Sequence, residues 1–278
     1  MKDLKRQTYR SWATKLAFKQ NMMPVWIAHQ NRSVTTTQRN KLNLLYSQTP
    51  VGTLRTSADL AARGVSADLA VHYVRAGWLT RLARGVFCRP NDPLTVHQSL
   101  VLLARQIEGL HVGGKSALEW HGITHYLRHV PVLDLYGWGS ASLPDWFTER
   151  FSARYHRKRL FDEQPDALRH VGPFDQRQRA PAVSSPERAL LELLSDVGVR
   201  QPMQEARELA EGTHNLRADV LRELLQHCTS VKTVRLCLQL GHEHSMPWVA
   251  KLDPSELPTG SKSRWVSRSP DGLLVLKP

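Results

Sequence analysis

The sequence predicts an α+β protein in which an N-terminal winged helix-turn-helix is followed by a larger, mainly helical α+β C-terminal domain. Two observations support this class. Three short helical stretches and two apolar runs follow one another between residues 35 and 93, which is the order of a winged helix-turn-helix. Beyond residue 94, helical patterns predominate and short strand-like runs interrupt them. With 278 residues, of which 41% are hydrophobic, the chain is long enough to pack two domains.

Three helices of the predicted winged helix are marked by the residues at their ends. The first begins at the threonines 35–37 and ends before Pro50. The second, 58–63, follows Thr56-Ser57, and the third, 67–76, follows Ser66. A glycine comes directly after each of the last two helices, where it favours termination.

A hairpin completes this unit. The apolar-rich runs 78–82 and 85–89 meet at Arg84-Gly85, which is typical of a tight turn between two strands. We therefore assign a basic N-terminal arm to residues 1–30, the winged helix to residues 31–95 and a C-terminal effector domain to residues 96–278. We expect translation to start either at Met1 or at Met22 or Met23.

The remaining chain is expected to alternate between helices and a few strands. We expect helices over 94–108, 116–121, 146–151, 187–197, 203–211, 218–227 and 231–240, strands over 131–137 and 155–161, a loop over 176–181, and short strand-like runs between 248 and 276.

The net charge of +13 is concentrated at the front of the chain. Residues 1–95 hold 15 Lys and Arg against four Asp and Glu, whereas residues 96–278 are almost neutral, with 23 against 21. A small basic unit attached to a neutral one indicates that the front part binds a polyanion, and we expect double-stranded DNA.

The sequence contains no stretch of 18 apolar residues, so it predicts no membrane span. Three widely spaced cysteines suit a cytoplasmic protein without a disulfide framework.

The third helix of the winged helix is the expected recognition helix. Its apolar residues share one face, so that Asp68, His72 and Arg75 lie on the other. Arg75 is the expected base reader because a guanidinium suits guanine, and the hairpin arginines are expected to hold phosphates. The helix starts at Ser57 and Ser66 offer backbone N–H groups to phosphates. The candidate DNA-binding residues are Arg55, Ser57, Ser66, Asp68, His72, Arg75, Arg81 and Arg84.

Residues 109–116 match the Gly-x-x-x-x-Gly-Lys-Ser pattern of phosphate-binding loops. Such a loop requires a buried strand directly before it and a substantial helix after it. Here a predicted helix leads in, and the following helix is about six residues long. A nucleotide-binding enzyme that uses Lys115 and Ser116 is therefore an alternative function, and a helix start is the preferred interpretation.

Other catalytic and metal-binding patterns find little support. His242-Glu243-His244 lacks the i, i+4 spacing of the helical zinc motif. Gly122 interrupts the helix that would align His121, His125 and His129. No Gly-x-Ser-x-Gly turn occurs. We expect a protein that is not an enzyme and uses no cofactor or metal ion.

Three stretches together resemble the AbiEi antitoxins of type IV toxin–antitoxin systems. Residues 77–87 are similar to the hairpin of the family's winged helix, and residues 116–122 with 185–192 are similar to the core of its C-terminal domain. The ending is similar too, in the segment 230–236, in Trp248 and in the segment 260–264.

This resemblance implies a transcriptional autorepressor that binds inverted repeats in its own promoter. It also implies an antitoxin whose C-terminal domain neutralises a nucleotidyltransferase-like toxin without requiring a stable complex. Lys232, Arg235, Lys262 and Arg264 match the family's ending, and we expect them to form the antitoxin surface because no local packing demands four cations there. A solvated face without a partner is the alternative interpretation of these cations. A winged helix that binds only proteins is a further alternative.

Overall fold

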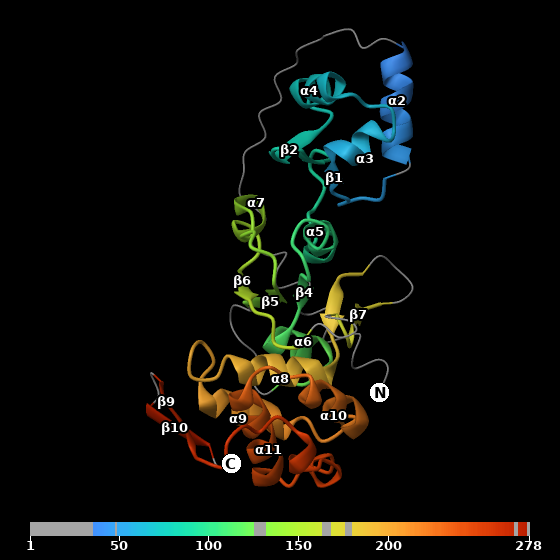
Figure 1. Ribbon diagram of the computed structural model, residues 1–278. Coiled ribbons are helices and arrows are strands. Elements are labelled where there is room, and N and C mark those ends of the chain that lie inside the picture. The colour runs from blue at the N-terminus through green and yellow to red at the C-terminus, as the bar shows by residue number, and fades with distance from the viewer. Residues whose placement is uncertain are drawn as a thin grey trace.

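The computed structural model describes residues 36–47, 49–124, 132–162, 168–175, 180–269 and 272–276. The predicted N-terminal arm, with both alternative start methionines, lies outside these residues. The described chain is elongated and has three tiers (Figure 1): short helices with a small sheet at one end, a five-stranded sheet in the middle and a layer of helices at the other end. The predicted mixture of helices and strands is confirmed.

Residues 36–93 form the first tier, which we call the N-terminal unit. Its helices and hairpin lie where the sequence predicts them. The two-residue strand that precedes the second helix was not predicted, because so short a strand produces no pattern in the sequence. The three strands form an antiparallel sheet in the order β1-β3-β2. The elements are α2 (Thr36–Ser47), β1 (Arg55–Thr56), α3 (Ser57–Ala61), α4 (Ala67–Arg75), β2 (Thr80–Ala83) and β3 (Val86–Cys88).

The N-terminal unit has a small core of its own and is joined to the second tier by apolar contacts. Leu42, Leu60 and Tyr73 are among the buried residues of the small core. Leu54 and Val86 instead belong to the core that continues into α5 (Val96–Leu103). The sheet of the N-terminal unit therefore packs on α5, which lies below it in Figure 1.

The second tier is a mixed five-stranded sheet in the order β6-β5-β4-β8-β7. β5 pairs with β6 and β4 with β8 in parallel, and the other two pairs are antiparallel. The strands are β4 (His111–Val112), β5 (Leu133–Gly137), β6 (Ala153–Arg157), β7 (Val171–Pro173) and β8 (Ala182–Ser184), with α6 (Gly114–Trp120) after β4 and α7 (Asp145–Thr148) before β6.

The third tier contains the four helices that the sequence predicts. They are α8 (Pro186–Ser195), α9 (Met203–Glu211), α10 (Ala218–Gln226) and α11 (Val231–Glu243). α8 is the central helix: it packs against α6 on one side and against α10 and α11 on the other. Ser185 caps α8 by accepting from the backbone N–H of Arg188, and Pro186 stands in the first turn, as expected.

The chain ends in two short 3₁₀ turns, η2 (Val249–Lys251) and η3 (Pro254–Glu256), and in the antiparallel hairpin of β9 (Trp265–Ser269) and β10 (Gly272–Leu276). Cys88, Cys228 and Cys237 are buried free thiols. None of the described helices has the length and apolar character needed to cross a membrane.

Several predicted boundaries are wrong, each for a local reason. The helix expected over 94–108 ends at Leu103 and continues as turns, because the buried Ile107 prolongs the apolar pattern without being helical. The strand expected over 155–161 is β6, which begins two residues earlier. Leu160 and Phe161, which suggested the later strand, pack in the core of the third tier instead. Short strands such as β4 and β8 were not predicted at all.

Ser116 does not cap α6 as expected. The helix begins at Gly114, two residues earlier. The Ser116 hydroxyl accepts from the backbone N–H of Asp134 at 2.8 Å and donates to the carbonyl of Val132 at 3.3 Å. It therefore joins α6 to the start of β5.

Candidate nucleic-acid interface

The outward face of α4 carries the polar residues that the sequence assigns to DNA. Ser66 is the N-cap, and its hydroxyl accepts from the backbone N–H of Leu69 at 3.3 Å. Asp68 and Arg75 are exposed and His72 is half-buried, whereas Ala70 and Tyr73 on the opposite face are buried. The periodicity of α4 therefore presents these polar side chains to solvent on one face, as expected.

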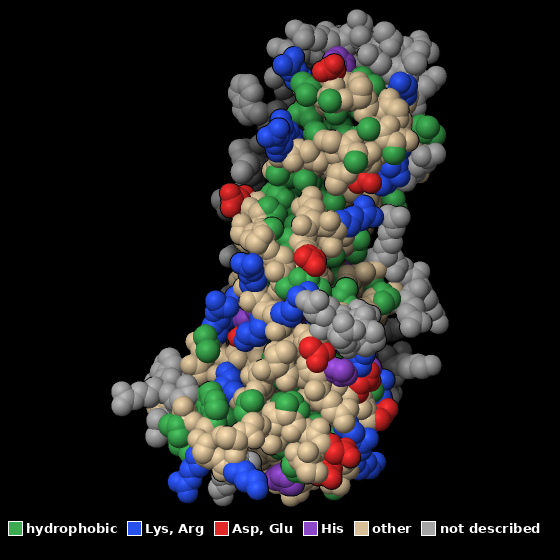
Figure 2. Space-filling model, in the orientation of Figure 1, with side chains coloured by type: hydrophobic (Ala, Val, Ile, Leu, Met, Phe, Trp, Pro, Cys, Tyr) green, Lys and Arg blue, Asp and Glu red, His purple; other side chains and the backbone are tan. Residues whose placement is uncertain are grey.

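The hairpin places two more cations on the same unit. Arg81 and Arg84 are both exposed, and the side chain of Arg81 donates to the carbonyl of Ala83 at 3.3 Å. Gly85 has a φ of +76°, a conformation that glycine adopts at no steric cost, so it allows the chain to turn directly after Arg84. Figure 2 shows Lys and Arg side chains over the region of α4 and β2.

Two of the expected DNA contacts are not presented to solvent in the expected way. Arg55 is only 8% exposed in β1, and its guanidinium donates to the hydroxyl of Thr49 at 3.1 Å. It therefore acts in the packing of the N-terminal unit. Ser57 is exposed, but its backbone N–H donates to the carbonyl of Gly85 at 2.9 Å and is not directed at an external phosphate. The N-cap of α3 is Thr56, which forms a capping box with Asp59.

Two exposed apolar side chains near these cations were not singled out by the sequence. Val71 is 43% exposed and Trp78 is 42% exposed. Val71 follows Asp68 by three residues and precedes Arg75 by four, so all three share one helical face. That spacing is the signal that identifies Val71 as part of the face. An apolar side chain on such a face suits contact with a thymine methyl group.

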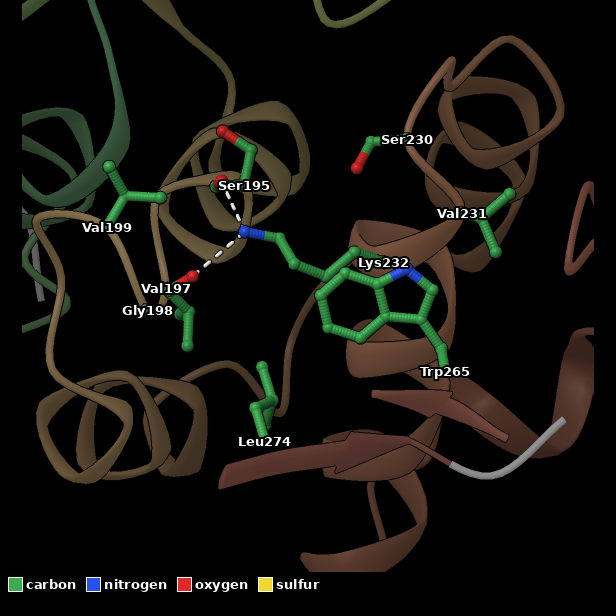
Figure 3. A pocket seen from close by; sticks show the side chains of 9 residues that line it. All are labelled: Ser195, Val197, Gly198, Val199, Ser230, Val231, Lys232, Trp265 and Leu274. Atoms are coloured by element: carbon green, nitrogen blue, oxygen red, sulfur yellow. Dashed lines mark hydrogen bonds between the residues drawn. The ribbon is translucent and has the colours of Figure 1, made fainter. Parts of the chain in front are cut away.

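The four cations expected to form the antitoxin surface divide into two pairs. Lys262 and Arg264 are exposed. Lys232 is half-buried, and its ammonium donates to the carbonyls of Ser195 and Val197 at 2.8 Å each, as Figure 3 shows. It thereby bonds to the last carbonyl of α8 and to a carbonyl of the turn that follows the helix.

Arg235 is not a surface residue as expected, because it is only 4% exposed. Its guanidinium donates to the carbonyl of Thr259 at 2.6 Å, to that of Ser263 at 2.7 Å and also to that of Ser261. One buried guanidinium thus holds the segment that displays Lys262 and Arg264. The expectation that no local packing requires these cations is wrong for Lys232 and Arg235.

A buried polar centre, not predicted from the sequence, lies where α8 meets the sheet. Glu192 is 1% exposed, and its two carboxylate oxygens each have two polar partners. One oxygen lies 2.8 Å from both His111 Nε2 and Arg188 Nε. The other accepts from the Ser184 hydroxyl at 2.7 Å and from the backbone N–H of Gly114 at 3.1 Å.

The same centre continues through His156 on β6. Its Nε2 lies 2.9 Å from an oxygen of Asp134, and its Nδ1 lies 2.7 Å from an oxygen of Asp196. Asp196 also accepts from the Tyr136 hydroxyl and from Lys158, each at 2.8 Å. Burial disfavours the charged imidazole, but the two carboxylates outweigh it and raise the pKa of His156. The charges of this centre are thus largely balanced by one another.

The polar centre explains the match to a phosphate-binding loop. A Cβ at Gly113 would collide with the Glu192 carboxylate, and one at Gly114 would lie 2.7 Å from the Tyr136 hydroxyl. The two glycines are therefore required by close packing. The Lys115 ammonium forms an ion pair with Glu205, and Ser116 bonds to the strand β5. These contacts favour a structural role for the motif.

A small cavity of about 190 Å³ opens beside this centre, with Asp134, His156 and Asp196 in its wall. Among the described residues, no group of three or more His, Cys, Asp or Glu side chains is arranged to hold a metal ion.

The polar centre predicts how stability depends on pH. Burial raises the pKa of Glu192, but His111 and Arg188 outweigh it and lower the pKa to about 2, below the value of about 4.3 in an unfolded chain. The unfolded state then binds more protons, so this contribution is present above pH 4.3 and is lost as the pH falls toward 2. Urea unfolding between pH 6 and pH 2.5 measures this loss. A Glu192→Gln variant should show a flatter profile, and an identical slope in both proteins would contradict the assignment.

Residues 38–129 match the profile of a family described as "Transcriptional regulator, AbiEi antitoxin N-terminal domain", and residues 131–277 match one described as "Transcriptional regulator, AbiEi antitoxin, Type IV TA system". Comparison with curated proteins gave no significant match. Among solved structures, the RV2827C protein from Mycobacterium tuberculosis is similar in fold, with a TM-score of 0.50 and 18% sequence identity over 88% of this chain and 94% of that one.

Proposed function

Since both family profiles together span most of its length, this chain belongs to the AbiEi family of antitoxins and transcriptional regulators of type IV toxin–antitoxin systems, and we propose that it represses its own promoter and neutralises a partner toxin. The DNA-binding part of this proposal is assigned to the N-terminal unit, which we interpret as a winged helix-turn-helix. The toxin-directed part is assigned to the second and third tiers.

The observation that carries the DNA-binding proposal is the outward face of α4 beside the β2–β3 hairpin. The order of elements in the N-terminal unit is that of a winged helix, with α3 and α4 as the helix-turn-helix pair and the hairpin as the wing. On this interpretation α4 enters the major groove, and the wing lies along the backbone or the minor groove. The expected ligand is an inverted repeat in the chain's own promoter.

Individual residues then take distinct roles. Arg75 at the exposed end of α4 is proposed to read guanine, with Asp68 and His72 on the same face. Ser66 places the start of α4 against a phosphate, although its hydroxyl already caps the helix. Arg81 and Arg84 on the wing are proposed to hold phosphates. Arg55 and Ser57 are left out of this set because of their contacts within the protein.

We expect Arg84→Ala to weaken binding to all duplexes by a similar factor. A phosphate contact carries no sequence information, so its loss should also reduce the slope of log affinity against log salt concentration by about 1. Fluorescence anisotropy with a promoter duplex and a scrambled duplex at four salt concentrations measures both effects. Arg200→Ala, which removes an exposed arginine from the third tier, is the matched control. A loss confined to the promoter duplex would assign Arg84 to base recognition instead.

The repressor proposal is tested in cells with a reporter driven by the DNA upstream of this chain's own gene. Full-length protein should lower reporter output, and Arg75→Ala should restore it at equal protein level. Reporter output that is independent of the full-length protein would contradict autorepression.

The toxin-directed role is tested by co-expression with a nucleotidyltransferase-like toxin encoded beside this chain. Wild-type protein should relieve growth inhibition, and the double variant Lys262→Ala, Arg264→Ala should relieve it less, because both cations are exposed. The double variant should unfold at the same temperature as wild type. Arg235→Ala is unsuitable for this test, since it removes a buried guanidinium that bonds to three carbonyls. Full rescue by the double variant would place the antitoxin surface elsewhere.

A further inference from the structure

A second, larger cavity lies between the N-terminal unit and α5. Its volume is about 540 Å³, within the range of about 300 to 1,000 Å³ that is typical of small-molecule sites. It lies at the junction of two tiers, where such sites commonly occur. Its wall is formed by Pro50, Thr53, Leu54, Arg55, Asp59, Arg63, Gln98, Val101, Leu102 and Arg105.

The charge of this wall is predominantly positive. Arg55, Arg63 and Arg105 are its three cations, and Asp59 is its one acidic residue. Figure 2 shows blue side chains gathered beside a red one between α3 and α5. The arginines of the wall outnumber its one carboxylate, and this composition favours an anionic ligand.

Asp59 interacts both with the start of α3 and with the arginines of the cavity. Its Oδ2 accepts from both the backbone N–H and the hydroxyl of Thr56 at 2.9 Å each, so it forms the capping box of α3. Burial raises the pKa of Asp59, but the bonds from Thr56 and the nearby Arg105 and Arg55 outweigh it and lower the pKa. Its contact with Arg105 is long, at 3.7 Å. One carboxylate thus stands against the cations of the wall, and Arg63 and Arg105 leave this side of the cavity with a net positive charge.

Two buried polar atoms of the lining residues have no partner within the described chain. Nε of Arg63 is a donor, although its Nη1 donates to the carbonyl of Asp59 at 2.8 Å. Oε1 of Gln98 is an acceptor, although the amide nitrogen donates to the carbonyl of Val51 at 3.4 Å. Buried polar atoms without partners are unfavourable, and both atoms are covered in this conformation. A rotation of the flexible Arg63 and Gln98 side chains would turn them toward a ligand that supplies an acceptor to one and a donor to the other.

Apart from Thr53, the remaining wall is apolar, with Leu54, Val101 and Leu102 among its residues. An inorganic anion would fill only a small part of such a cavity. The combination of arginines, an apolar wall and a glutamine acceptor suits a phosphate attached to a flat ring that carries an N–H group. That combination of groups is found in a nucleotide.

We propose that this cavity binds a nucleoside monophosphate or a phosphate-bearing molecule of similar size, with the phosphate between Arg63 and Arg105 and the ring toward Gln98. Arg63 lies in the turn between α3 and α4, which precedes the proposed recognition helix. Occupation of the cavity should therefore change the affinity for operator DNA. This regulatory half rests on the proposed function, whereas ligand binding itself does not.

The first test contains no DNA. Full-length protein is titrated calorimetrically with AMP, GMP, CMP and UMP, and with adenosine and inorganic phosphate as probes of each half of the ligand. At least one monophosphate should bind saturably and more tightly than either half. Arg105→Ala should weaken that binding about tenfold or more, as should Arg63→Ala, because each removes a charged hydrogen-bond donor. Arg200→Ala, remote from the cavity, should leave it unchanged.

Arg105 has a side chain that is 50% exposed, so its variant is expected to fold normally, and equal unfolding temperatures verify this. Absence of monophosphate binding at millimolar concentration would overturn the proposal. So would binding that Arg63→Ala and Arg105→Ala leave unchanged.

The second test adds operator DNA. The monophosphate should change operator affinity of wild type but not of Arg105→Ala. If the monophosphate binds in the calorimeter but leaves the affinity of wild type for operator DNA unchanged, only the proposed regulation of DNA binding is overturned. If duplex DNA instead displaces the monophosphate competitively, and Arg105→Ala weakens DNA binding without ligand, the arginines are phosphate contacts of the duplex and the small-molecule proposal is wrong.

Discussion

Replacing Glu192 with alanine is expected to lower the free energy of unfolding by about 3 to 5 kcal/mol. The carboxylate is buried and has four polar partners, of which Arg188 is itself buried. Its removal leaves a guanidinium in the protein interior without its carboxylate, and this desolvation penalty, rather than the lost attraction alone, accounts for the size of the effect. Urea unfolding at pH 7 measures the change.

The matched control is Glu149→Ala, which removes an exposed carboxylate at the end of α7. Its effect should stay within about 0.5 kcal/mol. Glu192→Gln should fall between the two, because it keeps the volume and part of the hydrogen bonding but loses the charge. A loss below about 1 kcal/mol for Glu192→Ala would show that the polar centre does not stabilise the fold as described.

The Arg75→Ala variant is expected to lose about 1 to 3 kcal/mol of binding free energy on the promoter duplex. The side chain lies exposed on the outward face of α4, and a bidentate contact with guanine carries sequence information. Its loss should therefore reduce the difference between promoter and scrambled duplexes. Anisotropy titrations with both duplexes measure that difference.

The comparison with Arg84→Ala separates the two roles. Arg84→Ala should weaken both duplexes alike, whereas Arg75→Ala should act chiefly on the promoter duplex. If both variants bind both duplexes like wild type, the proposed contact face is wrong. Unchanged unfolding temperatures are expected for both variants, since neither side chain is buried.

The elements that could be predicted from sequence are those with strong local signals. Caps, glycines and helical periodicity located α2, α4 and α8, and the Arg84-Gly85 turn located the β2–β3 hairpin. Strands of two or three residues, such as β4 and β8, were missed because so few residues produce no alternation. They exist because neighbouring strands and α8 complete the sheet around them.

The candidate residues were predictable to the extent that their exposure followed from periodicity. Asp68 and Arg75 lie on the outward face of α4 as expected. Arg235 and Glu192 show why the rest was not predictable. A charged residue in a sequence is usually predicted to lie exposed on the surface. Only the tertiary contacts reveal that Arg235 bonds to three carbonyls or that Glu192 has four polar partners.

The central claim is that the N-terminal unit binds the chain's own upstream DNA in a sequence-specific manner. It is tested most directly by a salt titration of the full-length protein on that upstream duplex and on a scrambled duplex of equal length. Sequence-specific recognition predicts tighter binding to the upstream duplex at every salt concentration, with affinities that fall steeply as salt rises because phosphate contacts release counterions. Equally weak binding to both duplexes would contradict it and would show that the N-terminal unit binds DNA only non-specifically, through its positive charge.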